Sequence, residues 1–246
     1  MEENLQSTNY MYILISAILA IVPAFLLVWY YYKQDKQKPE PKGLITKIFL
    51  LGIVVTFPVI LVELIVGYFE RVFVEVPLFL VFFRAYVVAA FCEEVFKLLI
   101  VKKFAYNKVA FDEMMDGVVY TIMASLGFAC MENILYVIGG GIGVAILRAF
   151  TAVPMHAVAS GMMGAYIGRA KFAADKHAEK SLLYKGLWIA ILIHGLYDFF
   201  LFAAPVLGAI WGFAIFPLLI WTFIKLRRKI KSAIAEDIQA GRVSRE

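Results

Sequence analysis

The chain has 246 residues, of which 63% are hydrophobic and 17% are charged, and its mean hydropathy is +0.81. A soluble domain is nearer half apolar and about a quarter charged, so this composition excludes an ordinary soluble domain. The formal charge of +5 comes from basic residues beside apolar segments and does not indicate nucleic-acid binding. Cys92 and Cys130 both lie inside apolar segments, so we expect buried free thiols.

Apolar segments of about 20 residues or more recur along most of the chain, and each is long enough to cross a hydrocarbon core of about 30 Å. A lipid-exposed span must satisfy its backbone internally, which favours helices. We therefore predict an all-α, polytopic transmembrane bundle that forms one integral membrane domain over 1–246, with an extracytoplasmic leader at 1–10 and a basic cytoplasmic tail at 225–246. The seven predicted spans are 11–32, 44–69, 77–101, 114–138, 143–168, 182–203 and 205–224.

Lys and Arg residues are distributed unequally between the two sides of these spans. Alternate loops and the tail hold 20 of the 24, whereas the opposite loops hold only Arg71. The positive-inside rule therefore predicts an N-terminus outside and a C-terminus in the cytoplasm, which requires an odd number of spans. The acidic leader and the long first apolar segment favour a retained helix over a cleaved signal peptide.

Several ionisable residues lie within the predicted spans, where an ionised side chain is costly and is therefore a candidate for function. Glu63, Arg84 and Arg148 belong to no local motif, and Asp116 is expected near the cytoplasmic edge. The others form four patterns, one on each of four spans. With a helical rise of about 1.5 Å per residue, these four patterns lie at similar depths near the centre of the membrane.

The third and sixth spans each carry acidic and basic side chains within about one helical turn of each other. In the third span, Glu93 and Glu94 lie four and three residues before Lys97, so either carboxylate can reach its ammonium group. Lys97 would hold one carboxylate as an anion and leave the other to accept or donate a proton. In the sixth span, His194 and Asp198 are four residues apart, which lets the carboxylate orient the imidazole.

The fourth span contributes Phe128, Glu132 and Asn133, and the fifth contributes His156 and Ser160. Carboxylates and imidazoles around a wet cavity are suited to activating water, with a Glu as general base and a His that donates to an oxyanion. The sequence contains no Ser-based nucleophile elbow, phosphate-binding loop or His-Glu-x-x-His helix, so we expect water to be the nucleophile.

The spacing of these residues does not decide whether the water is bound to a metal ion. We expect no cofactor, because the Glu-Glu-x-x-Lys pattern favours a carboxylate that acts directly on water. Zinc is the alternative, with His156, His194 and one of Glu132 or Asp198 as three ligands and an open fourth position.

Taken in order, the four patterns resemble the PrsW family of intramembrane proteases, which is grouped with the CAAX prenyl endopeptidases and the bacteriocin-processing proteins. The resemblance rests on Glu93-Glu94-x-x-Lys97, Phe128-x-x-x-Glu132-Asn133, His156-x-x-x-Ser160 and His194-x-x-x-Asp198. It extends over about 23–224 and includes the segments Asp35-x-x-x-Pro39-Glu40-Pro41 and Asp116-Gly117.

The resemblance implies peptide-bond hydrolysis within or beside the bilayer, as a first, site-1 cut in a single-pass membrane protein of the anti-sigma-factor type. It implies that Glu93 activates water, that Glu94 and Lys97 hold the site, and that His156 and His194 stabilise the oxyanion or bind a metal. It also implies a multi-pass protein of a bacterial cytoplasmic membrane, with lipid and the substrate as partners and no nucleic acid.

Two other classes of function remain open at this stage. Carboxylates and histidines at the membrane midplane also build relays, so a proton- or ion-coupled transporter is an alternative. In a non-catalytic membrane scaffold, the same residues would only pair for stability, as Lys97 with a Glu and His194 with Asp198. Glu132 stands where the CAAX relatives have His, which leaves its role open.

Overall fold

The computed structural model describes residues 2–35, 38–73 and 75–243, apart from the side chains of 2–13 and 72–73. Residue 1 of the predicted leader and 244–246 of the predicted tail lie outside this description. The described residues contain no β-strand, in agreement with the all-α prediction. In chain order, the helices are α1 (Glu2–Tyr32), α2 (Lys42–Gly67), η1 (Tyr68–Phe73), α3 (Pro77–Phe83), η2 (Arg84–Phe91), α4 (Cys92–Phe104), α5 (Met114–Phe150), α6 (Ala152–Lys171), α7 (Lys176–Leu207), η3 (Ala209–Ala214) and α8 (Ile215–Gln239).

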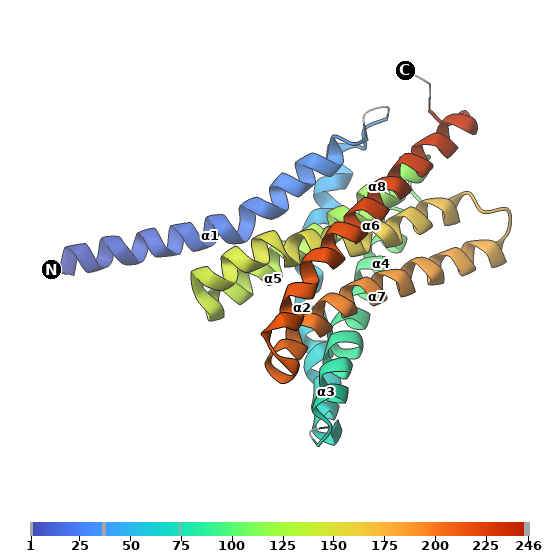
Figure 1. Cartoon of the computed structure of the whole chain (residues 1–246). Coiled ribbons are helices and arrows are strands. Elements are labelled where there is room, and N and C mark those ends of the chain that lie inside the picture. The colour runs from blue at the N-terminus through green and yellow to red at the C-terminus, as the bar shows by residue number, and fades with distance from the viewer. Residues whose placement is uncertain (1, 36–37, 74, 244–246) are drawn as a thin grey trace.

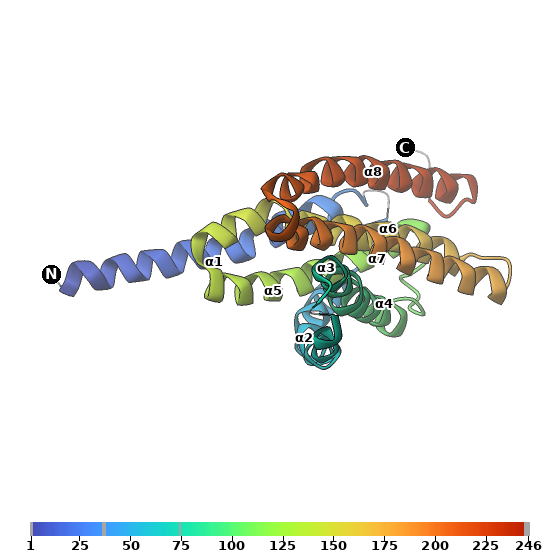
Figure 2. The ribbon, with the colours of Figure 1, turned by 60° about the horizontal axis from the view of Figure 1, so that its bottom comes forward.

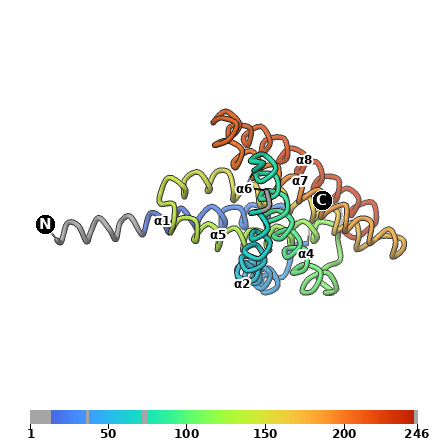
Figure 3. The backbone as a smooth tube through the Cα atoms, turned by 90° about the horizontal axis from the view of Figure 1, so that it is seen from below, coloured from blue at the N-terminus to red at the C-terminus, as the bar shows by residue number. Residues whose placement is uncertain are grey.

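Helices α5 and α6 form the centre of the bundle (Figure 1). α5 packs against α1, α2 and α6, and α6 packs against α7. Figure 2 shows α8 on one side of this group and α2, α3 and α4 on the other. In the view from below, α2 and α4 again lie on the side away from α8 (Figure 3). Every residue of α5 from Met115 to Cys130 is buried, because other helices surround this part of it.

Five helical segments among the described residues are long and apolar enough to cross a membrane: Leu14–Tyr32, Lys42–Arg71, Met114–Lys171, Lys176–Leu207 and Ala209–Gln239. The predicted spans 114–138 and 143–168 both lie in the third of these segments. α5 turns back at Gly141, where φ is 72°, a conformation that glycine adopts without the steric penalty of a Cβ. The count of seven spans and the orientation of the termini stay predictions.

The predicted third span, 77–101, is helical but is not one regular α-helix. α3 and α4 are joined by η2, a π-helix of eight residues that ends directly before Cys92. The i→i+5 pairing of a π-helix changes which side chains share a face, and such segments are frequent at functional sites. Periodicity of apolar residues could not show this change of hydrogen bonding.

Two predicted boundaries differ from the observed ones. The span predicted at 143–168 is interrupted at Thr151, which separates α5 from α6. α7 continues through Pro205 and ends at Leu207, before Gly208 with φ 107°, so α8 begins at Ile215 and extends into the predicted tail. Pro205 lies in the last turn, where it does not end the helix, whereas Gly208 adopts the left-handed conformation that does.

The segments rich in Lys and Arg meet at one end of the bundle, which we call the basic end. The ion pairs that join them are Lys38–Asp112 at 2.5 Å, Lys102–Glu179 at 3.2 Å and Arg169–Glu236 at 2.5 Å. These pairs connect the loop after α1 to the loop before α5, α4 to α7, and α6 to α8. The grouping agrees with the alternation of basic loops in the sequence.

Close contact between α5 and α6 depends on glycines. A Cβ at Gly117 would overlap backbone atoms of Gly164 and Gly168, and a Cβ at Gly164 would overlap the Gly117 carbonyl. Small residues at such positions let two helix backbones touch. This contact fixes the position of α6, which carries His156, against α5, which carries Glu132.

Replacement of Gly164 by leucine is expected to lower the thermal unfolding temperature of the detergent-purified protein, because overpacking a tight contact typically costs about 1–3 kcal/mol. Gly143→Leu serves as the control, since Gly143 is exposed and its Cβ would meet no atom within 4 Å. Equal unfolding temperatures for the two variants would contradict the role of this contact.

Candidate active site

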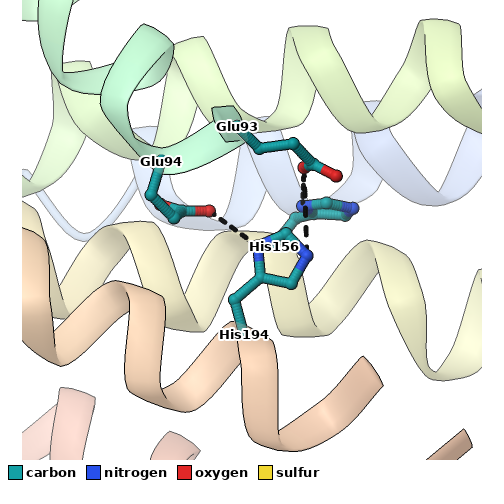
Figure 4. A group of neighbouring side chains, drawn as sticks. All are labelled: Glu93, Glu94, His156 and His194. Atoms are coloured by element: carbon teal, nitrogen blue, oxygen red, sulfur yellow. Dashed lines mark hydrogen bonds and ion pairs between the residues drawn. The ribbon is translucent and has the colours of Figure 1, made fainter. Parts of the chain in front are cut away.

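Side chains predicted from four separate spans meet at one place in the bundle. The contributions are Glu93, Glu94 and Lys97 from α4, Glu132 from α5, His156 from α6, and His194 and Asp198 from α7. Figure 4 shows the carboxyl groups of Glu93 and Glu94 facing the two imidazole rings. The ring centroids of His156 and His194 are 5.0 Å apart. The structure thus brings these residues together, and their catalytic roles stay predictions.

The Lys97 ammonium group lies at the centre of this cluster. Its Nζ donates to Glu93 Oε2 at 3.0 Å and to Glu94 Oε1 at 2.8 Å, and it lies 3.0 Å from His156 Nδ1. The Phe128 ring covers it, with Nζ 4.5 Å from the ring centroid. Lys97 is fully buried, and a buried charge is tolerated only when it is paired. Both carboxylates that were predicted to reach Lys97 do so.

Glu94 is enclosed by donors from three helices. Besides Lys97, Ser160 donates to its Oε2 at 2.8 Å, and His194 Nδ1 lies 3.0 Å from its Oε1. Ser160 Oγ also lies 2.9 Å from Ser125 Oγ, whose hydroxyl donates to the His156 carbonyl at 2.8 Å. These contacts fix the Glu94 carboxylate in one position.

Each histidine has contacts at both ring nitrogens. Each directs Nδ1 toward the centre of the cluster, to Lys97 in the case of His156 and to Glu94 in the case of His194. His156 Nε2 is 2.8 Å from Glu132 Oε2, and His194 Nε2 is 3.3 Å from Asp198 Oδ2, the pairing that the spacing of four predicted. An outer carboxylate therefore holds each imidazole in place.

A cavity of about 680 Å³ opens onto this cluster. The site residues on its wall are Glu93, Glu132, His156, His194 and Asp198. Glu94 and Lys97 are not among the described residues that line it. The wall continues along α5 to Gly139 and Gly140, and so runs away from the basic end, where α5 begins.

Arg148 contacts the cluster and Glu63 lines its cavity, although no sequence pattern assigned either a chemical role. Arg148 Nη2 lies 2.8 Å from Glu132 Oε2, and its Nε donates to Asn133 Oδ1 at 3.0 Å. Asn133 in turn donates to the Ala20 carbonyl of α1 at 3.0 Å. Glu63 of α2 and Arg148 both line the cavity. Their position within apolar segments marked both residues as candidates for function. The residues that they contact could not be predicted, because these contacts depend on how the helices pack.

Other candidates lie outside the cluster. Arg84 pairs with Glu70 at 2.6 Å and is about half exposed. Cys92 is buried, and its thiol donates to the Val87 carbonyl at 3.4 Å.

Ser125 contacts the cluster but was not identified from the sequence. It lies seven residues before Glu132, about two helical turns away on the same face of α5, and this spacing could have identified it.

Four residues offer donors to a metal ion. One ligand atom each from Glu93, Glu94, His156 and His194 lies within 4.8 Å of the others. The Lys97 ammonium group lies within 3.0 Å of an atom of Glu93, Glu94 and His156, so an ion among these donors would displace it. The donor set consists of carboxylate oxygens and imidazole nitrogens, which zinc and related divalent ions take as ligands. It shares both histidines with the zinc site predicted from sequence but has Glu93 and Glu94 in place of Glu132 or Asp198, because those two hold the outer nitrogens.

Known proteins resemble this chain over most of its length. The sequence profile described as PrsW family intramembrane metalloprotease matches residues 40–224. The chain belongs to the PrsW family. It is 35% identical to Protease PrsW of Geobacillus kaustophilus, over 91% of this chain and 93% of the relative, and 36% identical to Protease PrsW of Bacillus subtilis, over 91% and 96%. No solved structure matches it significantly.

Membership of the PrsW family, together with the apolar helices, identifies the chain as a multi-pass membrane protein of an intramembrane protease family. The family is described as metalloproteases. With the four converging donors, this description favours the use of a metal over the expectation that no cofactor is used, and it does not name the metal.

Replacing Lys97 by methionine should destabilise the detergent-purified protein by about 3–5 kcal/mol, because two buried carboxylates lose their counter-charge. The double variant Glu94→Gln/Lys97→Met should lose less than the sum of the two single changes. Arg84→Met is the matched control, since the exposed pair with Glu70 is worth under about 1 kcal/mol. Denaturant unfolding measures all four variants, and equal losses for Lys97→Met and Arg84→Met would refute the central role of Lys97.

Proposed function

We propose that this chain hydrolyses a peptide bond in a single-pass, membrane-anchored protein, with water activated by Glu93. The main support is the different placement of the two adjacent carboxylates. Glu93 lines the cavity, whereas Glu94 is held by Lys97, Ser160 and His194. The carboxylate that can meet a water molecule and a substrate is therefore Glu93.

In the proposed reaction, Glu93 takes a proton from water as the water oxygen attacks the carbonyl carbon of the peptide bond. When the carbon–nitrogen bond breaks, the same proton passes from Glu93 to the departing amine. Lys97 and Glu94 act as positioning residues, because they hold the Glu93 carboxylate at the cavity wall. Arg148 holds Glu132, and Glu132 holds His156.

A divalent metal ion would be held by Glu94, His156 and His194, three of the four converging donors, which leaves Glu93 to act as the base. When bound, such an ion supplies Lewis-acid chemistry that polarises a carbonyl group and lowers the pKa of water. His156 Nδ1 faces the Lys97 ammonium group and His194 Nδ1 faces the Glu94 carboxylate, so each nitrogen would exchange this contact for the ion. Nε2 of each ring faces an outer carboxylate, Glu132 for His156 and Asp198 for His194. In metal sites, such outer carboxylates fix the imidazole and raise its basicity.

The direction of the cavity supports a substrate that enters from the side opposite the basic end. The cavity wall reaches Gly139 and Gly140 of the α5 turn, far along the helix from Met114. Under the positive-inside rule the basic end is cytoplasmic, so this opening would face the extracytoplasmic side. An anti-sigma-factor-like protein, cut in a site-1 step in a bacterial cytoplasmic membrane, is the substrate that we propose from the family resemblance.

Glu93→Gln is expected to reduce cleavage by about 10²–10⁴-fold, because the variant cannot accept the proton from water. Substrates that accumulate in cells producing Glu93→Gln are identified first, and cleavage of one of them by the purified variants is then followed over time. Glu63→Gln is the control, since Glu63 also lines the cavity but lies on α2, outside the cluster. Undiminished cleavage by Glu93→Gln would refute its assignment as general base.

Removal of metal is expected to abolish cleavage, and zinc is expected to restore it. Mass spectrometry of the purified chain should find about one zinc ion per chain, with much less in the variant His156→Ala/His194→Ala. Unchanged cleavage by chain that retains no metal would contradict the metal site, while loss of cleavage in Glu93→Gln would still identify Glu93 as the base.

A further inference from the structure

A second group of buried carboxylates lies at the basic end, on residues that the proposed hydrolysis does not use. Asp35 follows α1, Glu113 precedes α5 as its N-cap, and Asp116 lies in the first turn of α5. They are 4%, 3% and 0% exposed. One carboxylate oxygen of each lies within 4.8 Å of those of the other two. Asp116 is 16 residues before Glu132 on α5, about 24 Å along the helix, so this group is separate from the candidate active site.

Helix capping explains only part of this group. Asp116 Oδ2 accepts the backbone N–H groups of Asp112 at 2.7 Å and Glu113 at 2.8 Å, and the Glu113 side chain accepts the Asp116 N–H in return, which forms a capping box. Asp116 Oδ1 and Asp35 Oδ2 are also buried, but neither has a hydrogen-bond partner. A buried, unpaired carboxylate oxygen is costly and needs an explanation.

No basic side chain described by the structure forms an ion pair with these oxygens. Lys38 pairs with Asp112, at the exposed edge of the group, and Arg242 pairs with Asp237. The described ion pairs of the basic end thus involve neither Asp35 nor Asp116, and Lys36 lies outside the described residues.

Glu40 adds a fourth carboxylate, 3% exposed, that accepts the Tyr120 hydroxyl and adjoins Asp116. Burial raises the pKa of the Asp35 carboxyl to about 6 and, with the neighbouring Asp116, that of Glu113 to about 9. Buried carboxylates raise one another's pKa in this way when they lie close together.

We propose that Asp35, Glu113 and Asp116 bind a divalent cation of the oxygen-preferring class, Ca²⁺ or Mg²⁺. Ca²⁺ takes oxygens at about 2.3–2.6 Å, so oxygens up to 4.8 Å apart can lie around one Ca²⁺ ion, whereas Mg²⁺, at about 2.0–2.1 Å, would draw them closer together. Unlike the candidate active site, the group offers no imidazole or thiolate, which argues against zinc. The ion would join the loop after α1 to the start of α5.

The test uses the full-length chain, purified in detergent and freed of metal. Ca²⁺ and Mg²⁺ are titrated separately while the unfolding temperature is followed, and Tb³⁺ luminescence excited through tyrosine reports occupancy directly, since Tyr120 adjoins the site. We expect at least one of the two ions to raise the unfolding temperature, and Tb³⁺ to bind in competition with it.

Single substitutions test whether the ion binds at Asp35, Glu113 and Asp116. Asp35→Asn and Asp116→Asn should each weaken Tb³⁺ binding at least tenfold, and Asp35→Asn leaves the α5 capping box intact, so it remains informative if Asp116→Asn does not fold. Asp112→Asn, a carboxylate at the exposed edge, and Glu93→Gln should both bind as the unmodified chain does. The proposal is overturned if the unmodified chain shows neither luminescence nor a shift in unfolding temperature, if Asp35→Asn binds normally, or if Glu93→Gln abolishes binding.

Discussion

The buried ammonium group of Lys97 is the constraint on which the rest of the site depends. An uncompensated charge at this depth is very costly, so Lys97 requires Glu93 and Glu94 beside it, and these carboxylates require Lys97. The same ammonium group contacts His156, and Glu94 contacts His194. Three helices, α4, α6 and α7, are thereby held in one arrangement around a charge that none of them could bury alone.

A second chain of contacts begins at His156 and leads to the opposite end of the bundle. His156 pairs with Glu132, Glu132 pairs with Arg148, and Asn133 joins Arg148 to the backbone of α1. Glu132 and Arg148 are both on α5 and are brought together because that helix turns back at Gly141. The same turn forms one end of the cavity, so the shape of the opening and the pairing of Glu132 share one cause.

Local spacing predicted the parts of the site that lie within a single helix. Glu93 with Lys97, and His194 with Asp198, are four residues apart, and a helix places such residues side by side in any fold. The pairs that cross between helices could not be derived in this way. Arg148 had no assigned partner, and Glu132 was offered as a zinc ligand, whereas it holds the outer nitrogen of His156.

The sequence by itself determined that the chain is a helical membrane protein with charged groups at similar depths, because hydropathy and helical rise are local properties. It also determined the family, through four ordered patterns that the profile match confirms. Only the tertiary structure decided that the charged groups on α4, α5, α6 and α7 face one cavity, that Glu93 and not Glu94 lines it, and that Asp35 meets Asp116 at the basic end. The rotation of each helix about its axis decides these contacts, and that rotation is set by packing such as the glycine contact of α5 with α6.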